Sequence, residues 1–159
     1  MGNVRFISDL HLGHENMAIK RGFICADDMN EHILKMWNSV VNTKDVTYIL
    51  GDITMEKTSD YPLLQKLNGL KNIVLGNHDM KNHTKELQKY VNGIAGMIKY
   101  KDVILTHCPI HPTELNHRFT HNIHGHVHEN TLDDERYINV SCEVVNYIPK
   151  LFAELIPQK

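Results

Sequence analysis

The chain has 159 residues, of which 42% are hydrophobic and 23% are charged, values that suit one soluble domain with a single core. Its formal charge of -2 at pH 7 supplies no basic field of the kind used to track long duplex nucleic acid. The N-terminal apolar run is too short for a signal peptide, and no apolar stretch approaches the ~20 residues of a membrane span. We therefore expect one cytoplasmic domain over residues 1–159 with no membrane partner, and the composition leaves its oligomeric state open.

Twelve histidines are the compositional oddity of the chain. Histidine is the commonest transition-metal ligand and a proton shuttle near neutral pH, so the excess favours a metal site. We interpret four of them as surface residues: His32, His83, His117 and His121. The three cysteines have neither the even number of a disulfide framework nor a CxxC spacing, so we expect free thiols. We interpret Cys108 as a small buried hydrophobe with no part in chemistry.

The first predicted element is a buried strand in residues 4–11, where β-forming apolar residues lead into the sequence Ser-Asp-Leu-His. In extended backbone, residues two apart point to the same face, so Asp9 and His11 could hold one ion together. A polar loop over 13–16 follows, from which His14 could reach a substrate phosphate. Apolar residues at helical spacing then predict a helix over 27–41, and we expect its Trp37 to lie in the core.

In the rest of the chain, predicted strands and helices alternate at first, and strands predominate after Gly93. Strands are predicted over 46–50, around 73, over 97–100 and 103–106 with a tight turn between them, and over 122–128, 137–140 and 151–156. Helices are predicted from 60 to 68, with Pro62 in the first turn, and after 81, where the lysines 81, 85 and 89 form a solvated face. This order favours an α/β fold, an α-β-β-α sandwich of two mixed β-sheets flanked by helices.

Oxygen or nitrogen ligands follow five of the predicted strands. In chain order they are Asp9, His11, Asp52, Asn77, His107, His126 and His128. Sites in α/β sheets form outside the carboxyl ends of strands, so these side chains are expected to converge. Donors without thiolate favour manganese, iron, zinc, nickel or cobalt. Seven ligands exceed the need of one ion and suit two ions about 3.5 to 4 Å apart that share a carboxylate.

The series D-x-H, G-D, G-N-H-D, T-H and G-H-x-H resembles the motifs of the calcineurin-like metallophosphoesterase family, and it extends over residues 9–128. The resemblance implies two divalent metal ions, with manganese favoured. It assigns to the first ion Asp9, His11 and His128. It assigns to the second ion Asn77, His107 and His126. Asp52 would bridge the two ions.

The same resemblance implies the chemistry of the site. A hydroxide bridging the ions would attack phosphorus in line, and the net positive charge would stabilise the transition state. His78 resembles the family's catalytic histidine, which protonates the leaving oxygen or steadies the phosphate. Many relatives carry an aspartate and an arginine shortly after Gly-Asp, whereas here Ile-Thr-Met-Glu-Lys follows Asp52. Asp79 could substitute as the partner of His78, and Arg118, in the loop before the last motif, could either clamp phosphate or lie on the surface.

The sequence thus predicts a dinuclear phosphoesterase that hydrolyses a phosphomonoester or phosphodiester, with a nucleotide or another small phosphorylated molecule as substrate. A nuclease acting on short or single-stranded nucleic acid is the alternative within enzymes, and it requires a basic path to the metals. A catalytically silent binding module with the same fold is the alternative outside enzymes. That alternative predicts missing ligands, whereas all seven ligand positions and His78 are occupied.

Overall fold

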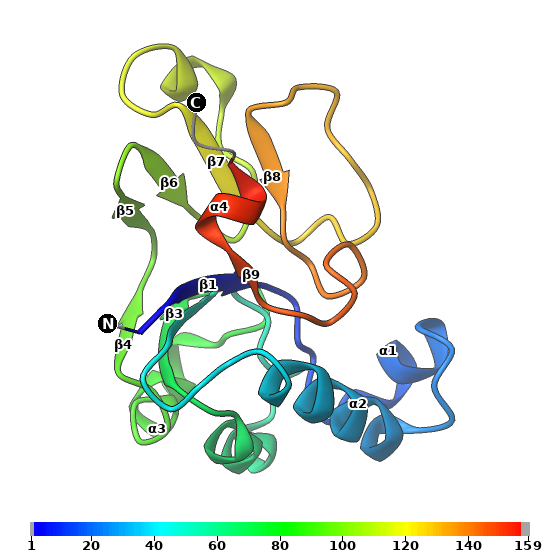
Figure 1. Ribbon diagram of the computed structural model, residues 1–159. Helices are drawn as coiled ribbons and strands as arrows, with labels where there is room; N and C mark the ends of the chain where they lie inside the picture. Colours follow the sequence, from blue (N-terminus) through cyan, green and yellow to red (C-terminus); the bar gives the residue numbers. More distant parts are fainter. Residues whose placement is uncertain (1, 157–159) are drawn as a thin grey trace.

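The computed structural model describes residues 2–156 as two β-sheets flanked by helices (Figure 1). The first sheet has the order β4-β3-β2-β1-β9 and the second has the order β5-β6-β7-β8. The strands of the first sheet are β1 (Val4–Ile7), β2 (Val46–Ile49), β3 (Leu70–Val74), β4 (Gly93–Ala95) and β9 (Lys150–Leu151). The strands of the second are β5 (Ile98–Tyr100), β6 (Val103–Leu105), β7 (His121–His124) and β8 (Tyr137–Asn139). The predicted sandwich of two mixed sheets is confirmed.

Helices lie along the outer side of the first sheet and at the chain's end (Figure 1). The α-helices are α1 (Glu15–Lys20), α2 (Ala26–Asn38), α3 (Thr84–Leu87) and α4 (Phe152–Leu155). Three 3-10 helices join them in the described part of the chain: η1 (Thr58–Lys66), η2 (Lys81–His83) and η3 (Pro112–Asn116). Within residues 2–156, none of these helices combines the length and apolar character that crossing a bilayer requires.

Parallel pairing brings the carboxyl ends of the central strands to one edge. In the first sheet, Ile7 of β1 is paired with Ile49 of β2, which is paired in turn with Ile73 of β3. The second sheet is also parallel from β6 to β8, and only its first strand, β5, runs antiparallel to its neighbour. A parallel bridge between Ser8 and Ser141 joins the ends of β1 and β8. The ends of both sheets therefore meet at the same place.

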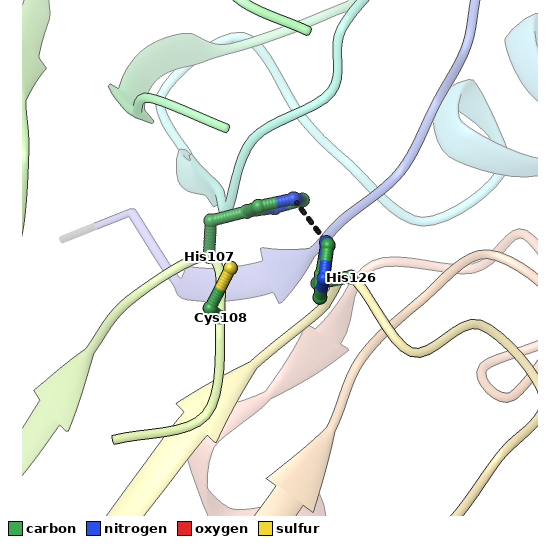
Figure 2. A group of neighbouring side chains, drawn as sticks. All are labelled: His107, Cys108 and His126. Carbon is green, nitrogen blue, oxygen red and sulfur yellow. Dashed lines mark hydrogen bonds between the residues drawn. The ribbon is translucent and has the colours of Figure 1, made fainter. Parts of the chain in front are cut away.

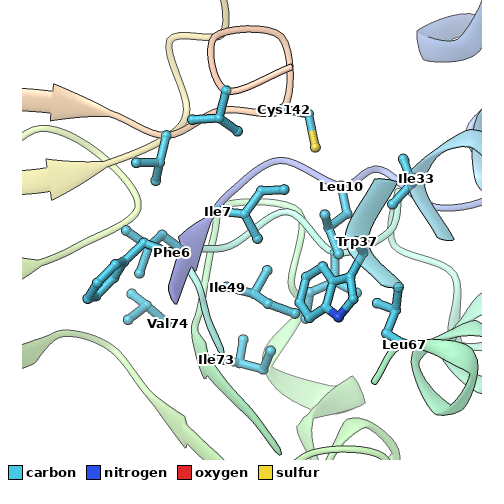
Figure 3. Packing of buried hydrophobic residues seen from close by; sticks show 14 of the residues in the cluster. Phe6, Ile7, Leu10, Ile33, Trp37, Ile49, Leu67, Ile73, Val74 and Cys142 are labelled. Atoms are coloured by element: carbon cyan, nitrogen blue, oxygen red, sulfur yellow. The ribbon is translucent and has the colours of Figure 1, made fainter. Parts of the chain in front are cut away.

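The core is formed by α2 packing on the first sheet and by aromatic residues between the sheets. Trp37 of α2 is fully buried over the sheet residues, and its indole Nε1 donates a hydrogen bond to the Asn68 carbonyl at 3.0 Å (Figure 3). Phe6 of β1 lies 5.4 Å, between ring centroids, from Tyr100 of β5 in the second sheet. The prediction that the helix around Trp37 is a core element is confirmed.

Five predicted elements differ from the structure. The strands predicted over 4–11 and 122–128 end at Ile7 and His124, because the chain turns into left-handed backbone at Asp9 and His126, so Asp9 and His11 do not share an extended strand. The segment predicted as a helix from 60 is the 3-10 helix η1, which contains Pro62, a residue without the N–H that a regular helix needs. The lysine-bearing segment after 81 is helical only as η2 and the single turn α3. The final strand stops at Leu151, because Glu154 accepts a hydrogen bond from the Leu151 N–H at 2.6 Å and starts α4. The sequence pattern also missed α1 and the short strand β4.

Candidate metal centre

Most of the predicted ligands lie where the chain bends sharply after a strand. Five of them have left-handed backbone, with φ of 59° at Asp9, 48° at His11, 54° at Asp52, 70° at His126 and 50° at His128. This conformation costs ~1–2 kcal/mol for a residue with a side chain, and such strain gathers at functional sites. The bends direct side chains from both sheets toward one place.

Glycine allows two close approaches at these bends. Gly51 has φ of 90°, and a Cβ there would lie 2.5 Å from Nδ1 of His107. A Cβ on Gly125 would overlap the side-chain oxygens of Ser8 and Asp9. Only glycine fits at these two positions, so β2 and β7 can bring their ligands close to those of the neighbouring strands.

One group of ligand atoms is formed by Asn77, His107 and His126. Nε2 of His107 and Nδ1 of His126 lie 3.2 Å apart (Figure 2), and each lies 2.9 Å from Oδ1 of Asn77. The other ring nitrogen of His107, Nδ1, lies 2.7 Å from the Leu50 carbonyl, which can only accept a hydrogen bond. Nδ1 therefore carries the proton, and Nε2 presents a lone pair to the group when the ring is neutral.

A second group is formed by Asp9, His11 and His128, whose ligand atoms lie within 4.8 Å of one another. Asp9 and His11 are buried, with 0% and 2% of their surface exposed. Within residues 2–156, Asp9 Oδ1 and both ring nitrogens of His11 have no hydrogen-bond partner. Leaving such buried atoms unpaired costs ~1–3 kcal/mol each, whereas a cation between them would satisfy them. Burial also lowers the pKa of His11 to about 3, so its ring is neutral and can donate a lone pair.

Asp52 lies between the two groups. Its Oδ2 is 3.8 Å from Nε2 of His11 in one group and 3.4 Å from Nε2 of His107 in the other. Burial acts to raise the pKa of Asp52, but the hydrogen bond and charge of His107 in its protonated form outweigh burial and lower it. The structure thus brings all seven predicted ligands together, with one ionised carboxylate between two nitrogen-rich groups. This donor set fits divalent transition-metal ions.

Residues that hold the ligands were not found from the sequence. Asp9 Oδ2 accepts hydrogen bonds from the His126 backbone at 2.9 Å and from Ser141 Oγ at 3.0 Å. Nδ1 of His128 lies 3.0 Å from Oε1 of Glu143, which also pairs with Arg21. A signal was present for two of these residues, because Ser141 and Glu143 directly follow a predicted strand, as the ligands do.

His78 lies beside the cluster, and its carboxylate neighbour is Glu56. The His78 ring is 5.9 Å from the His11 ring, and its Nδ1 is 3.3 Å from Oε1 of Glu56. The expectation that Asp79 pairs with His78 is wrong. The buried Asp79 carboxylate instead accepts backbone hydrogen bonds from Gly76 at 2.8 Å, Asp52 at 2.8 Å and Ile53 at 3.2 Å. Asp79 therefore fixes the loops that carry the ligands.

Of the two residues predicted to contact substrate, His14 lies beside the cluster and Arg118 does not. His14 is half-buried next to it, with its ring 5.9 Å from that of His11, and burial together with the charge of Lys57 lowers its pKa. Arg118 is exposed on the loop after η3, and the structure does not bring it to the ligands. The Thr120 N–H two residues later donates to the Asp102 carbonyl at 2.8 Å, at the start of β6, whereas the ligands lie beyond the end of that strand.

The interpretation of Cys108 as a buried hydrophobe is wrong. The residue is exposed, because the chain leaves β6 after His107 and enters an irregular loop at Pro109. Its sulfur and one nitrogen each of His107 and His126 lie within 4.8 Å of one another (Figure 2). The three cysteines are free thiols, as predicted.

Two solved enzyme structures share this architecture. An archaeal phosphodiesterase superposes with a TM-score of 0.53 at 20% identity, covering 89% of this chain and 85% of that one. The nuclease MPE of Pseudomonas putida superposes with a TM-score of 0.55 at 17% identity, covering 79% of this chain and 60% of that one. The fold is the metallophosphoesterase fold, and the cluster contains residue groups that could bind metal.

Closer relatives cover nearly the whole chain. No protein-family model matches the sequence. The uncharacterized protein MJ1445 of Methanocaldococcus jannaschii is 37% identical over 164 residues, covering 94% of this chain and 86% of that protein. The chain belongs to the same family as MJ1445. The Aquifex aeolicus protein of unknown function AQ665 superposes with a TM-score of 0.76 at 27% identity over 98% of both chains.

Proposed function

We propose that this protein is a calcineurin-like metallophosphoesterase that hydrolyses phosphoric esters with two divalent ions, manganese being favoured. The main support is the convergence of Asn77 Oδ1, His107 Nε2 and His126 Nδ1 within 3.2 Å of one another. Electron pairs held so close repel each other unless a proton or a cation lies between them. The unpaired buried atoms of Asp9 and His11 add a second place where a cation is needed.

Each ion has its own set of protein ligands in this proposal. The first would be held by Asp9, His11 and His128. The second would be held by Asn77, His107 and His126. Asp52 would serve both, since its Oδ2 approaches a histidine of each set. When bound, the two ions would acidify a water molecule and offset the negative charge that builds on the phosphoryl group.

The chain's own residues would supply the proton that the leaving group needs. His78 lies next to Asn77 in the sequence and close to His11 in space, at the rim of the cluster. Its Nδ1 faces Glu56, which would hold the ring in one orientation and one tautomer. In its doubly protonated form, His78 would then donate the Nε2 proton to the leaving oxygen of the ester and keep the Nδ1 proton that faces Glu56.

The openness of the site supports a small phosphorylated molecule or nucleotide as substrate. Asn77 and His126 are exposed, so their side of the cluster is accessible to an ester from solvent. His14, half-buried beside His11, would contact a phosphate oxygen. A nuclease acting on short or single-stranded nucleic acid is the second candidate. It is supported by the fold shared with the nuclease MPE and by the same open approach.

Reconstitution with metal tests the proposal. Protein stripped with a chelator and reloaded with Mn²⁺ is expected to hydrolyse p-nitrophenyl phosphate or bis(p-nitrophenyl) phosphate, and chelator should remove the activity. His107→Ala should lower turnover by about 100-fold or more, whereas the exposed His117→Ala should leave it unchanged. A protein that binds Mn²⁺ but turns over neither ester, no cyclic nucleotide and no oligonucleotide would support the binding module instead. Cleavage of a short single-stranded oligonucleotide alone would favour the nuclease.

A further inference from the structure

Arg21 and Glu143 form a buried ion pair behind the first group of ligands. Nε of Arg21 lies 2.8 Å from Oε1 of Glu143, with side-chain exposures of 1% and 18%. Arg21 caps the end of α1, and Glu143 follows β8, so the pair joins two distant parts of the chain. A buried ion pair is often no more stabilising than apolar residues of the same size. The further contacts of each partner therefore indicate what the pair does.

Arg21 fixes the backbone of the first ligand loop. Its Nη2 donates to the carbonyl of Asp9 at 2.7 Å and its Nη1 donates to the carbonyl of Leu10 at 3.1 Å. Asp9 has left-handed backbone, so the chain bends away from the course of β1 at this residue. The rigid guanidinium fork binds two successive carbonyls and holds this bend in place.

Glu143 orients the ligand that comes from the other sheet. Its Oε1, which pairs with Arg21, also lies 3.0 Å from Nδ1 of His128. A carboxylate facing Nδ1 keeps the proton there and leaves the lone pair on Nε2. The His128 ring stacks on that of His11, with centroids 5.4 Å apart and an angle of 24° between the planes. Contacts thus run from Asp9 through Arg21 and Glu143 to His128, joining two ligands of the first ion.

We propose that Arg21 and Glu143 are positioning residues that set the affinity of the first metal ion relative to the second. The inference rests on the proposed metal centre. In the second set, Nδ1 of His107, the ring nitrogen on the side away from the other ligands, faces the neutral carbonyl of Leu50. A charged partner raises the basicity of an imidazole more than a carbonyl does, so the first ion is held more tightly. Without Glu143 this preference is lost.

The test is the number of Mn²⁺ ions retained by Glu143→Gln. At a free Mn²⁺ concentration that fills only the tighter site, we expect about one ion per chain in the wild-type protein and far less than one in the variant. Calorimetric titration should show the tighter class of sites weakened by about 10- to 100-fold. Excess Mn²⁺ should restore most of the turnover, which a purely structural defect would not allow.

Glu129→Gln is the matched control. Glu129 lines the same cavity of about 260 Å³ as Arg21 and Glu143, but it forms only an exposed pair with Lys20 at 3.7 Å. This control should bind two ions with wild-type affinity. Because Glu143→Gln leaves Arg21 buried without its carboxylate, the double variant Arg21→Met/Glu143→Gln provides a second version of the test without that charge.

The outcomes separate the two proposals. Retention of both ions with unchanged affinity in Glu143→Gln, or equal weakening of both ions, overturns the positioning role. If Glu143→Gln does not fold, the same two results in the double variant overturn it. A wild-type protein that binds no Mn²⁺ contradicts the proposed metal centre itself.

Discussion

Oε1 of Glu56 lies 3.3 Å from Nδ1 of His78, although 22 residues separate them in the chain. Asp79, the immediate neighbour of His78, makes no such contact, because backbone N–H groups occupy its carboxylate. Glu56 has left-handed backbone, with φ of 57°, which bends the chain just after the Asp52 loop. In this chain a glutamate four positions after Asp52 therefore supplies the carboxylate beside His78.

Because of this contact, we expect Glu56 to contribute most to kcat when the leaving group of the ester is poor. A p-nitrophenolate leaves without a proton, whereas a phenolate or an alkoxide needs one in the transition state. Glu56→Gln should lower kcat on phenyl phosphate by about 10-fold and His78→Ala by about 100-fold, with much smaller losses on p-nitrophenyl phosphate. Steady-state kinetics on both esters measure the difference, and the exposed Glu114→Gln is the control. Equal losses on the two esters would show that neither residue assists the leaving group.

Asp79 is expected to stabilise the fold without acting on substrate. Its carboxylate accepts three backbone N–H groups and only 6% of the residue is exposed. Asp79→Ala would leave those donors buried and unpaired, which should lower the free energy of unfolding by about 3 kcal/mol. Urea denaturation in the presence of chelator measures this loss. The exposed Asp133→Ala should change stability by less than about 0.5 kcal/mol, and a similarly small effect at Asp79 would contradict the assignment.

Glu143 makes the metal-free protein sensitive to acid. Burial acts to raise the pKa of its carboxyl, but the hydrogen bond from His128 and the charge of Arg21 outweigh burial and lower the pKa from 4.5 to about 2. Between these two values the unfolded chain binds more protons than the folded one, so stability falls as the pH falls. The contribution is fully present above about pH 4.5 and is lost toward pH 2.

We expect Glu143→Gln to remove this dependence. The variant should be less stable than the wild type by about 2 kcal/mol near pH 6, after allowance for solvent screening, and the difference should shrink steadily below pH 4.5. Urea denaturation in chelator at pH values from about 6 down to about 3 measures this difference. Glu129→Gln should follow the wild-type curve. A constant difference at every pH would mean that the carboxyl of Glu143 does not titrate as described.

The convergence of the seven candidate ligands could be predicted from the sequence because the signal is local. A short apolar run followed by a carboxylate, amide or imidazole marks each of the five strand ends that carry candidate ligands, and parallel pairing then brings the ends of β1, β2 and β3 to one edge. The choice between Glu56 and Asp79 could not be predicted in this way. It depends on a left-handed bend at Glu56 and on which backbone donors surround Asp79, and neither leaves a periodic pattern.

Contacts between residues far apart in the chain, and very short helices, could also not be predicted from the sequence pattern. Arg21 and Glu143 are 122 residues apart, and their contact exists only once α1 packs beside the loop after β8. The helix α4 has four residues, so its apolar content resembled the end of a strand. Cys108 is exposed by the loop that begins at Pro109, whereas residue type alone favours burial.

Trp37 is expected to contribute strongly to stability and not to metal binding. It is fully buried between α2 and the first sheet, and its indole donates to the Asn68 carbonyl at 3.0 Å (Figure 3). Trp37→Ala should lower the free energy of unfolding by about 3 to 5 kcal/mol, because both the contacts and the hydrogen bond are lost. Trp37→Phe keeps most of the apolar volume but loses the hydrogen bond, so about 1 to 2 kcal/mol is expected.

Urea denaturation of the purified variants measures these losses, and Leu70→Ala is the control because Leu70 is 45% exposed. That control should change stability by less than about 0.5 kcal/mol. Trp37→Phe should still retain the wild-type number of Mn²⁺ ions, since the ligands are positioned by strand ends and not by the face of α2. Loss of metal in a folded Trp37→Phe would show that the packing of α2 and the geometry of the metal centre are coupled.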